Sequence, residues 1–423
     1  MGNINLADRI NQQLPAELVK FLQLAGSTAA RQEQQLFLVG GVVRDLLLER
    51  PNLDLDLVVE GDAIKLAEEL ARLLNGDVIA RSRFNTAKIR WQRWTIDIAS
   101  TRSESYTHPG ALPSIQTIND IHSDLIRRDF SINAMAVHVC PQHYGELIDR
   151  FNGLTDLKKG FIRCLHDQSF KDDATRIWRA VRYEQRLGFE IEKHTLDLIE
   201  RDLHYLKTIS GDRIRNELEL CLEEEKPQLI LRRADELGIL AKIHERLKFG
   251  DKSVKLFTKA RGTMEPFSAP EEFYLALLIY DLTVEELVEF NAILKIPRSP
   301  SRVLQETLLL KSELPALAEK ELTNGKIYRI LHRFHQTAIL ANLLIASSYV
   351  VKKRIELYLE KLYHVRTALS GEDLLELGIN AGPRVKEILE LLLEARLDGQ
   401  VHSREEEIAF ITQSKTAQFL ISK

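Results

Sequence analysis

The stretch that most constrains the fold is residues 36–59, LFLVGGVVRDLLLERPNLDLDLVV. It opens with an apolar run of strand length, passes through a Gly-Gly pair and a short helical pattern, and ends in alternating leucine and aspartate. Alternate residues of a strand share one face. Asp54 and Asp56 are therefore expected to point together to one face. The leucines that alternate with them are expected to point into the core; they are Leu53, Leu55 and Leu57.

The two aspartates are candidate metal ligands. Their Cα atoms are expected about 6.6 Å apart, from the rise of an extended strand. Two carboxylates that close repel each other unless a cation lies between them. The pair suits Mg²⁺ holding a triphosphate, because Gly40 and Gly41 allow close backbone approach and Arg44 can bind phosphate. Asp-x-Asp alone often marks only a solvated face, but its occurrence with Gly-Gly and arginine in one short block favours a nucleotide site.

This block resembles the nucleotidyltransferase motif of the DNA polymerase β superfamily, in particular the class II tRNA nucleotidyltransferase and bacterial poly(A) polymerase family. A second segment, RRDFSINA at residues 127–134, is similar to the family signature RRDF(T/S)-x-N-A. The resemblance is strong over residues 37–189 and looser to the end. It implies an α+β fold: an N-terminal polymerase-β-like head with a mixed sheet, followed by an all-helical neck, body and tail.

The remainder of the head reads as alternating helix and strand patterns. A helix is predicted from Pro15 to about Ala25, with Gly26 as its end, and a second over residues 63–74, ended by Asn75-Gly76. Three strands are predicted at residues 78–81, 87–91 and 95–99. A mixed sheet with helices on one side accommodates these elements.

Asp97 lies in the last of these strands, between Ile96 and Ile98, so it is expected on the polar face. A third carboxylate beside a metal pair can ligate metal or take the proton from an attacking hydroxyl. The alternative is an aspartate with a structural partner. Residues 101–125, with two prolines and a glycine, predict a mobile loop that ends in a short helix and repositions substrate.

The RRDFSINA segment supplies candidate nucleotide ligands. Arg127 and Arg128 can clamp phosphate oxygens, and Asp129 and Asn133 can hydrogen-bond ribose hydroxyls. An adjacent arginine pair by itself is more often a surface feature, so the assignment depends on the whole segment.

A long helix is predicted from Asp172 onward, with charged residues every third position. They are Asp173, Arg176, Arg179 and Arg182. Charged residues spaced in this way more commonly form a solvent-exposed helix face. The family motif is an acidic pair, two residues and arginine, and this chain has aspartate where glutamate is usual at position 172. The resemblance implies that Asp173 and Arg176 read the incoming base and that the later arginines contact phosphates.

From about residue 190 the patterns are helical throughout. Basic clusters in this half are usually solvated, but in an RNA-binding protein they become candidate phosphate contacts. They are Lys326, Arg329, Arg333, Lys352, Lys353 and Arg384, the last in a Gly-Pro-Arg turn. The expected divisions are an N-terminal helix at 1–26, the head at 27–165, the neck at 166–240, the body at 241–365 and a tRNA-binding tail at 366–423.

Composition narrows the setting. The net charge of −4 requires any RNA binding to use local basic patches. The three cysteines lack metal-binding spacing, so zinc and disulfides are not predicted and a cytoplasmic location fits. No apolar run approaches the roughly 20 residues of a membrane span, and the polar N-terminus is not a secretory signal.

Together, the patterns and the resemblance predict template-independent addition of CMP and AMP, from CTP and ATP, to the 3′ end of tRNA with Mg²⁺ as cofactor. No obligate protein partner is evident. Enzymes that add only CC or only A remain open alternatives. A poly(A) polymerase is disfavoured, because basic tails are absent and the tail resembles a tRNA-binding one. An RNA-binding module with a degenerate head is opposed by the intact Asp54, Asp56, Arg128 and Asp173.

Overall fold

The computed structural model describes residues 4–264 and 271–413. The chain forms two compact units, Met1–Glu245 and Arg246–Lys423. The first holds a sheet and its covering helices, and the second is built from helices. The finer division into neck, body and tail stays a prediction.

The first unit contains a seven-stranded mixed sheet in the order β3-β4-β5-β2-β1-β8-β9. Neighbouring strands run antiparallel except for β2 and β5, which are parallel. This confirms the predicted mixed sheet. The strands are β1 Gln35–Val39, β2 Leu55–Glu60, β3 Asp77–Ser82, β4 Thr86–Trp91, β5 Trp94–Ser100, β8 Met135–His138 and β9 Leu147–Asp149.

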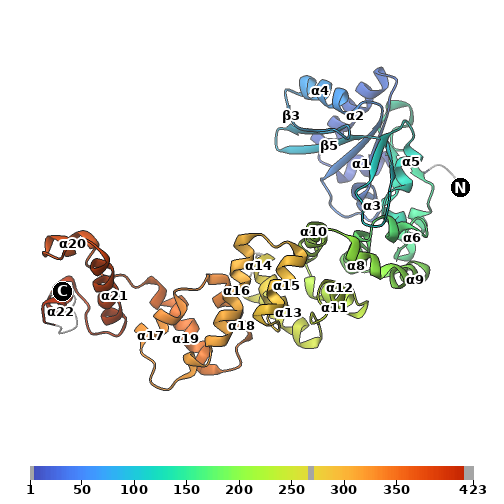
Figure 1. The fold of residues 1–423 in the computed structure, drawn as a ribbon. Helices are drawn as coiled ribbons and strands as arrows, with labels where there is room; N and C mark the ends of the chain where they lie inside the picture. Colours follow the sequence, from blue (N-terminus) through green and yellow to red (C-terminus); the bar gives the residue numbers. More distant parts are fainter. Residues whose placement is uncertain (1–3, 265–270, 414–423) are drawn as a thin grey trace. The chain divides into compact units, whose positions relative to one another are not determined.

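Helices cover both faces of this sheet (Figure 1). The main core lies on one face, under the four helices α1 Ala7–Gln13, α2 Ala16–Arg31, α3 Gly41–Leu47 and α4 Ala63–Leu74. A smaller core joins the other face to α5 Ile121–Ile126, so the expectation of helices on one side only is wrong. The predicted bounds of α4 are confirmed: Asp62 caps its first turn and Asn75 ends it in the left-handed conformation.

Two local predictions for this unit are wrong. Gly26 does not end the first predicted helix, because α2 continues to Arg31. Its small size instead permits close packing, since a Cβ there would lie 2.0 Å from the carbonyl oxygen of Val139. Leu53 is 43% exposed rather than buried. Strand pairing begins only at Leu55, so the alternation of faces does not extend back to Leu53.

Residues 101–125 are more ordered in secondary structure than the predicted loop. The strands β6 Arg102–Ser105 and β7 Ser114–Thr117 pair antiparallel as a separate hairpin. The short helix predicted at the end of this segment is confirmed as α5.

The predicted long helix from Asp172 is interrupted. The short helix α7 Ser169–Asp172 ends there, Asp173 has extended backbone, and α8 Thr175–Leu187 follows. Helix α8 contacts α10 Gly211–Leu222 and α11 Pro227–Glu236. The other elements of this region are α6 Gly153–Lys159, β10 Phe161–Ile162, β11 Glu190–Ile191, α9 Lys193–Asp202, α12 Leu240–Ile243 and the 3₁₀ turns Ser131–Asn133, Pro141–His143 and Leu203–Thr208.

The described part of the second unit is helical, as predicted. Two of the buried clusters among its described residues draw on residues 310–397 and 369–411. The helices are α13 Asp251–Met264, α14 Glu271–Leu278, α15 Val284–Leu294, α16 Arg298–Glu313, α17 Asn324–Leu331, α18 Gln336–Ile345, α19 Tyr349–Glu360, α20 Gly371–Glu376, α21 Pro383–Leu397 and α22 Arg404–Gln413, with 3₁₀ turns at Ala316–Ala318 and Leu362–His364.

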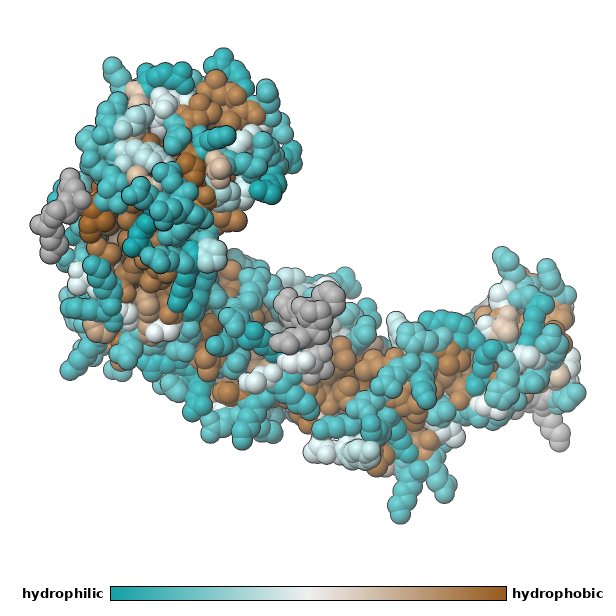
Figure 2. Space-filling view, turned by 180° about the vertical axis from the view of Figure 1, so that it is seen from behind, coloured by the Kyte–Doolittle hydropathy of each residue, from teal (hydrophilic) through white to brown (hydrophobic). Residues whose placement is uncertain are grey.

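Hydrophilic side chains cover most of the face seen in Figure 2. Among the described helices, none combines the length and the apolar character needed to cross a lipid bilayer.

Candidate active site

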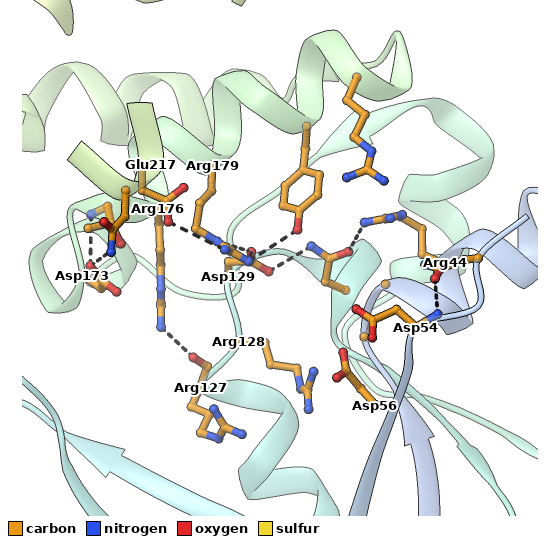
Figure 3. A pocket seen from close by; sticks show the side chains of 18 of the residues that line it. Arg44, Asp54, Asp56, Arg127, Arg128, Asp129, Asp173, Arg176, Arg179 and Glu217 are labelled. Carbon is orange, nitrogen blue, oxygen red and sulfur yellow. Dashed lines mark hydrogen bonds and ion pairs between the residues drawn. The ribbon is translucent and has the colours of Figure 1, made fainter. Parts of the chain in front are cut away.

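A cavity of about 910 Å³ opens in the first unit where the sheet meets α8 and α10 (Figure 3). Its walls combine the glycine turn after β1, the aspartates at β2, the Arg-Arg-Asp segment and the helices α8 and α10. The residues that line it are Gly40, Gly41, Arg44, Pro51, Asn52, Leu53, Asp54, Asp56, Arg127, Arg128, Asp129, Asn133, Asp173, Thr175, Arg176, Arg179, Tyr183, Arg186, Arg213, Asn216 and Glu217.

Asp54 and Asp56 both reach this cavity, as predicted from the alternation. Burial and the nearby charge of Asp54 raise the pKa of Asp56 to about 6, against the opposing effect of Arg128. The second carboxylate is therefore costly to ionise without a cation, and a divalent ion between the two would offset that cost. Within residues 4–264 and 271–413, no group of three or more His, Cys, Asp or Glu side chains is arranged to hold a metal. The candidate metal ligands are therefore the carboxylates of Asp54 and Asp56. This pair fits Mg²⁺ if phosphate oxygens and water complete the coordination.

Gly40 has no side chain to fill the space beside Arg128 and Asp56. Its φ of +73° lies in the left-handed region, where a side chain would be strained. A Cβ at this position would also lie 3.1 Å from Nη1 of Arg128 and 3.8 Å from Oδ2 of Asp56. Glycine therefore leaves open the space at which Arg128 and Asp56 converge.

Asp97 lies beside Asp56, because the two residues are register partners in the parallel pair of β2 and β5. Its carboxylate forms an ion pair with Lys88 at 3.0 Å. Asp97 is not one of the described residues that line the cavity. Both alternatives for it, a catalytic carboxylate and a structurally paired one, remain predictions.

Arg44 is buried and anchored. Its Nε and Nη2 donate to the two carboxylate oxygens of Asp45, both at 2.8 Å, and Nη1 donates to Oδ1 of Asn133 at 2.8 Å. Asn52 holds the same Asp45 carboxylate at 2.7 Å. Arg44 therefore joins α3 to the turn at Ser131–Asn133.

A continuous network runs from Arg44 to α8 (Figure 3). Asn133 accepts from Arg44 and donates to Oδ1 of Asp129 at 3.1 Å. Arg179 donates to Oδ2 of the same aspartate. The predicted ribose ligands Asp129 and Asn133 are thus brought to the cavity, with much of their hydrogen-bonding capacity already used within the protein.

Arg127 and Arg128 share one buried carboxylate. Arg127 donates to Oδ1 of Asp124 at 2.7 Å and Arg128 to Oδ2 at 3.0 Å. Burial opposes ionisation of Asp124, but Arg128 and Arg127 together hold its pKa below the usual value. Arg127 also contacts Glu104 of the β6–β7 hairpin at 3.1 Å. Both arginines line the cavity as cations that are positioned before any phosphate arrives.

The predicted base-reading residues Asp173 and Arg176 also reach the cavity. Arg176 donates from Nη1 to Oγ of Ser169 at 2.8 Å and from Nη2 to the carbonyl of Arg127 at 2.6 Å. A guanidinium carries five N–H donors, so donors remain for a ligand. Asp173 accepts from Thr175 and from Arg213.

Arg182 was predicted to share the ligand-binding face of its helix with Arg176 and Arg179. It is not one of the described residues that line the cavity. It faces Glu217 and Glu224 instead, at 3.5 and 3.8 Å. Each residue turns an α-helix by about 100°, so Arg182 lies about 120° around α8 from Arg176, whereas Tyr183 and Arg186 lie within about 80° of it. Residues spaced strictly by three therefore move progressively away from one face of a helix. Residues spaced alternately by three and four stay on that face.

Several lining residues were not singled out from the sequence. They are Thr175, Tyr183, Arg186, Arg213, Asn216 and Glu217. The ring of Tyr183 lies 5.2 Å from the guanidinium carbon of Arg44 and 5.6 Å from that of Arg179. The sequence did contain a signal for the lining residues of α8, because Arg176, Arg179, Tyr183 and Arg186 are spaced by three, four and three residues, as on one face of a helix.

Several of the basic residues predicted to bind RNA are paired with glutamates of the second unit. Arg329 contacts Glu394 and Arg333 contacts Glu313. Lys353 forms an ion pair with Glu356 at 2.8 Å. Arg384 lies in the first turn of α21, and Lys326 is exposed in α17. Their assignment to RNA contacts stays a prediction. All three cysteines are buried and free.

A polymerase-type head with paired aspartates and a glycine turn defines a class of nucleotidyltransferases, and sequence comparison agrees. Residues 36–163 match the family described as poly A polymerase head domain, and residues 188–249 match the probable RNA and SrmB-binding site of polymerase A. The A-adding tRNA nucleotidyltransferase of Halalkalibacterium halodurans is 33% identical over 415 residues, which cover 96% of this chain and 95% of that protein. The chain belongs to the tRNA nucleotidyltransferase family.

Other relatives agree with this assignment. The A-adding tRNA nucleotidyltransferase of Geobacter sulfurreducens is 33% identical over 94% of this chain, although the chain spans only 47% of that longer protein. An apo structure of a CCA-adding enzyme is 30% identical, with a TM-score of 0.83 over 97% of this chain and 99% of the other. The Thermotoga maritima CCA-adding enzyme, solved in complex with tRNA-CCA, is 29% identical with a TM-score of 0.77 over 97% of this chain and 99% of that one.

Proposed function

We propose that this enzyme transfers CMP and AMP from CTP and ATP to the 3′ end of tRNA in the cytoplasm and releases pyrophosphate. The observation that carries the proposal is that one cavity holds both the paired carboxylates, Asp54 and Asp56, and the base-reading candidates, Asp173 and Arg176. Relatives solved with ATP and with CTP, at 29% and 30% identity, support these substrates.

Asp54 and Asp56 are the residues that would hold Mg²⁺. When bound, the metal supplies charge that favours ionisation of the attacking 3′-hydroxyl and neutralises the α-phosphate and pyrophosphate. Arg127 and Arg128 hold the triphosphate, and the backbone at Gly40 and Gly41 lets it approach closely. Arg44 and Asn133 join α3, which follows this glycine turn, to Ser131–Asn133.

Base selection follows from the chemistry of the two readers. Cytosine and adenine each present a ring-nitrogen acceptor beside an exocyclic amino donor, whereas uracil and guanine present a ring N–H beside a carbonyl. Arginine offers only donors and ionised aspartate only acceptors. Arg176 therefore meets the ring nitrogen and Asp173 the amino group for both CTP and ATP, without a nucleic-acid template.

A second candidate is an enzyme that adds only the terminal A. The observation that favours it is the naming of the relatives: those called A-adding are 33–36% identical to this chain, whereas those called CCA-adding, solved structures included, are 26–30% identical. A relative called CC-adding is 29% identical.

One assay separates these activities. Three tRNA transcripts, ending in the discriminator base, in C and in CC, are each offered CTP alone, ATP alone and both. Completion of all three to CCA supports full CCA addition. A added only to the CC-ended transcript supports the A-adding enzyme, and CC without A supports a CC-adding one. Long A tracts on an unrelated RNA would overturn the tRNA-specific proposal in favour of a poly(A) polymerase.

A further inference from the structure

Tyr183 of α8 lines the cavity, and the hydrogen of its hydroxyl is unused. The phenol oxygen accepts a hydrogen bond from Nη2 of Arg179 at 3.4 Å. A phenol can also donate one hydrogen bond of its own. Among the residues that the structure describes, no oxygen or nitrogen accepts that hydrogen. The hydroxyl therefore brings an available donor to the cavity in which the nucleotide is expected to bind.

Cations surround the aromatic ring of Tyr183. The guanidinium carbons of Arg44, Arg179 and Arg182 lie 5.2, 5.6 and 5.4 Å from the ring centre. The ring also packs edge-on with Phe130, at 6.0 Å between the ring centres. Cation–π and edge contacts need only an aromatic ring, so phenylalanine would make them too. These contacts account for the ring and leave the hydroxyl unexplained.

The charged groups around the ring cannot use the hydrogen of this hydroxyl. A guanidinium offers only donors. Each of the three arginines faces a carboxylate, in the pairs Arg44–Asp45, Arg179–Asp129 and Arg182–Glu217. Both oxygens of Asp45 and both oxygens of Asp129 already accept hydrogen bonds within the protein. An acceptor for the hydroxyl must therefore come from water or from a ligand.

We propose that the hydroxyl of Tyr183 binds the triphosphate of the incoming nucleotide, by donating to a non-bridging phosphate oxygen. An ionised phosphate oxygen only accepts, which suits a position surrounded by donors. A ribose hydroxyl carries a hydrogen of its own and would need a further acceptor there. Hydrogen bonds from O–H to an anion are short and strong, so this contact contributes to nucleotide affinity. The inference rests on the proposed function, in which the cavity binds CTP or ATP.

The test compares Tyr183→Phe with the parent and with the matched control Tyr205→Phe. Tyr183→Phe removes the hydroxyl and keeps the ring. Tyr205 lies in the same unit, with its ring 4.0 Å from that of His204, and is not among the described residues that line the cavity. Equilibrium binding to the enzyme in Mg²⁺ buffer is measured for four ligands, together with Tm. The ligands are the nucleotide that the parent uses, its 2′-deoxy analogue, its nucleoside and inorganic tripolyphosphate.

We expect Tyr183→Phe to raise the Kd for the nucleotide, for its 2′-deoxy analogue and for tripolyphosphate by about tenfold, the usual effect of one hydrogen bond to a charged group. The Kd for the nucleoside and the Tm stay at the parent values. Tyr205→Phe leaves all four affinities unchanged. If Tyr183→Phe does not fold, Tyr183→Met takes its place, because it also removes the hydroxyl and fills much of the same space.

Unchanged binding of tripolyphosphate by a folded Tyr183 variant would overturn the inference. Weaker binding of the nucleotide but not of its 2′-deoxy analogue would assign the hydroxyl to the ribose instead. Weaker binding of the nucleoside would mark Tyr183 as a structural residue of the cavity. A parent enzyme that adds neither CMP nor AMP to any tRNA transcript would overturn the proposed function, and this inference with it. The activity of the parent therefore distinguishes the two failures.

Discussion

Arg179 donates from Nε and Nη2 to a single oxygen of Asp129, at 2.9 and 2.6 Å. The other oxygen of Asp129 accepts from the backbone of Phe130 and from Asn133, at 2.8 and 3.1 Å. Burial alone would raise the pKa of Asp129, but Arg179 and these hydrogen bonds hold it below its usual value. This pair joins the end of the head to α8, the helix that carries the base-reading arginine.

Breaking that pair is expected to destabilise the first unit in a pH-dependent way. Asp129→Asn removes a buried, paired charge and leaves Arg179 with only Glu217, 3.9 Å away; breaking a buried ion pair typically costs about 3–5 kcal/mol. A carboxyl whose pKa is lowered by folding stabilises the fold above its unfolded pKa, and this stabilisation is lost as pH falls through the folded pKa. The parent should therefore exceed the variant in unfolding free energy at neutral pH, and the two should converge in strong acid.

Urea denaturation at a series of pH values measures that difference. Asp167→Asn is a matched control, because Asp167 is exposed and its carboxylate contacts His194 at the surface, whereas Arg201 donates to its backbone carbonyl. Its effect should be small at every pH. A difference between parent and Asp129→Asn that stays constant across pH would show that the charge of Asp129 is not what stabilises the fold.

Asp56 is expected to show the opposite dependence on pH. Its pKa is raised to about 6, so its charged form is the unfavourable one in the folded state. The penalty is absent in acid and grows as pH rises from about 4 to 6, reaching roughly 1–3 kcal/mol. In metal-free buffer at pH 8, Asp56→Asn should therefore be more stable than the parent, although it should lose nucleotide addition.

Added Mg²⁺ should stabilise the parent and leave Asp56→Asn nearly unchanged, which can be followed by Tm with and without the ion. The magnesium affinity of the parent should fall as pH drops below 6. If Asp56→Asn retains near-normal turnover, or if Mg²⁺ stabilises both proteins equally, the carboxylate pair is not the metal site.

Local patterns in the sequence were enough to predict most of the head. Alternation predicted the strands, and cap residues predicted α4, because both are set by neighbours in the chain. The predicted burial of Leu53 was wrong, because burial at this position depends on where strand pairing with β5 begins and not on the local alternation alone. The β6–β7 hairpin was also missed, because the Pro and Gly content of this segment is typical of a loop whether or not the flanking residues pair as strands.

The candidate site was predictable only where a motif spans adjacent residues. The glycine turn, the aspartate pair and the Arg-Arg-Asp segment reach one cavity as expected. Arg213 and Glu217 lie about 40 residues beyond Asp173, on a helix whose pattern shows only that one side is buried. Their place in the site depends on packing of α10 against α8, which is a tertiary relationship that no local spacing encodes.

Two arginines of α8 provide a test of which face binds the nucleotide. Arg186 lines the cavity, whereas Arg182 is buried against Glu217 and Glu224. Arg186→Gln should raise the KM for nucleotide several-fold with little change in Tm. Arg182→Gln should lower Tm and leave KM within about twofold, because it removes a buried cation from Glu217, which keeps only Arg179 at 3.9 Å. The reverse result would place the triphosphate on the Arg182 side of the helix.

The hairpin is expected to influence the site through Glu104. This carboxylate contacts Arg102 at 3.0 Å, Arg127 at 3.1 Å and the hydroxyl of Tyr106 at 3.0 Å. Shortening the connection between β6 and β7 should impair addition of A more than addition of C, if the enzyme adds full CCA. Single-nucleotide addition to C-ended and CC-ended transcripts measures the two steps. Equal loss of both, or an unaltered protein that adds only A, would contradict a repositioning role.

The strongest prediction concerns removal of both base-reading residues. Within the described residues, the hydrogen bonds to the Asp173 carboxylate all reach Oδ1, which leaves Oδ2 as an acceptor, and Arg176 keeps unused donors after contacting Ser169 and Arg127. Against UTP or GTP, Arg176 would face a ring N–H and Asp173 a carbonyl, so the remaining donors of Arg176 and the remaining acceptor of Asp173 would have no partner on the base. Sites built on such hydrogen bonds reject mismatched partners by about 10⁴-fold or more.

The variant with both Asp173→Ala and Arg176→Ala should therefore lose discrimination as well as rate. Incorporation of UTP and GTP should approach that of CTP and ATP, at a low overall level, in single-nucleotide addition assays. A matched control is Arg163→Ala with Lys158→Ala, since both lie outside the described cavity lining and should leave the ratios intact. If the Asp173 and Arg176 variant still excludes UTP and GTP as strongly as the parent, other residues read the base.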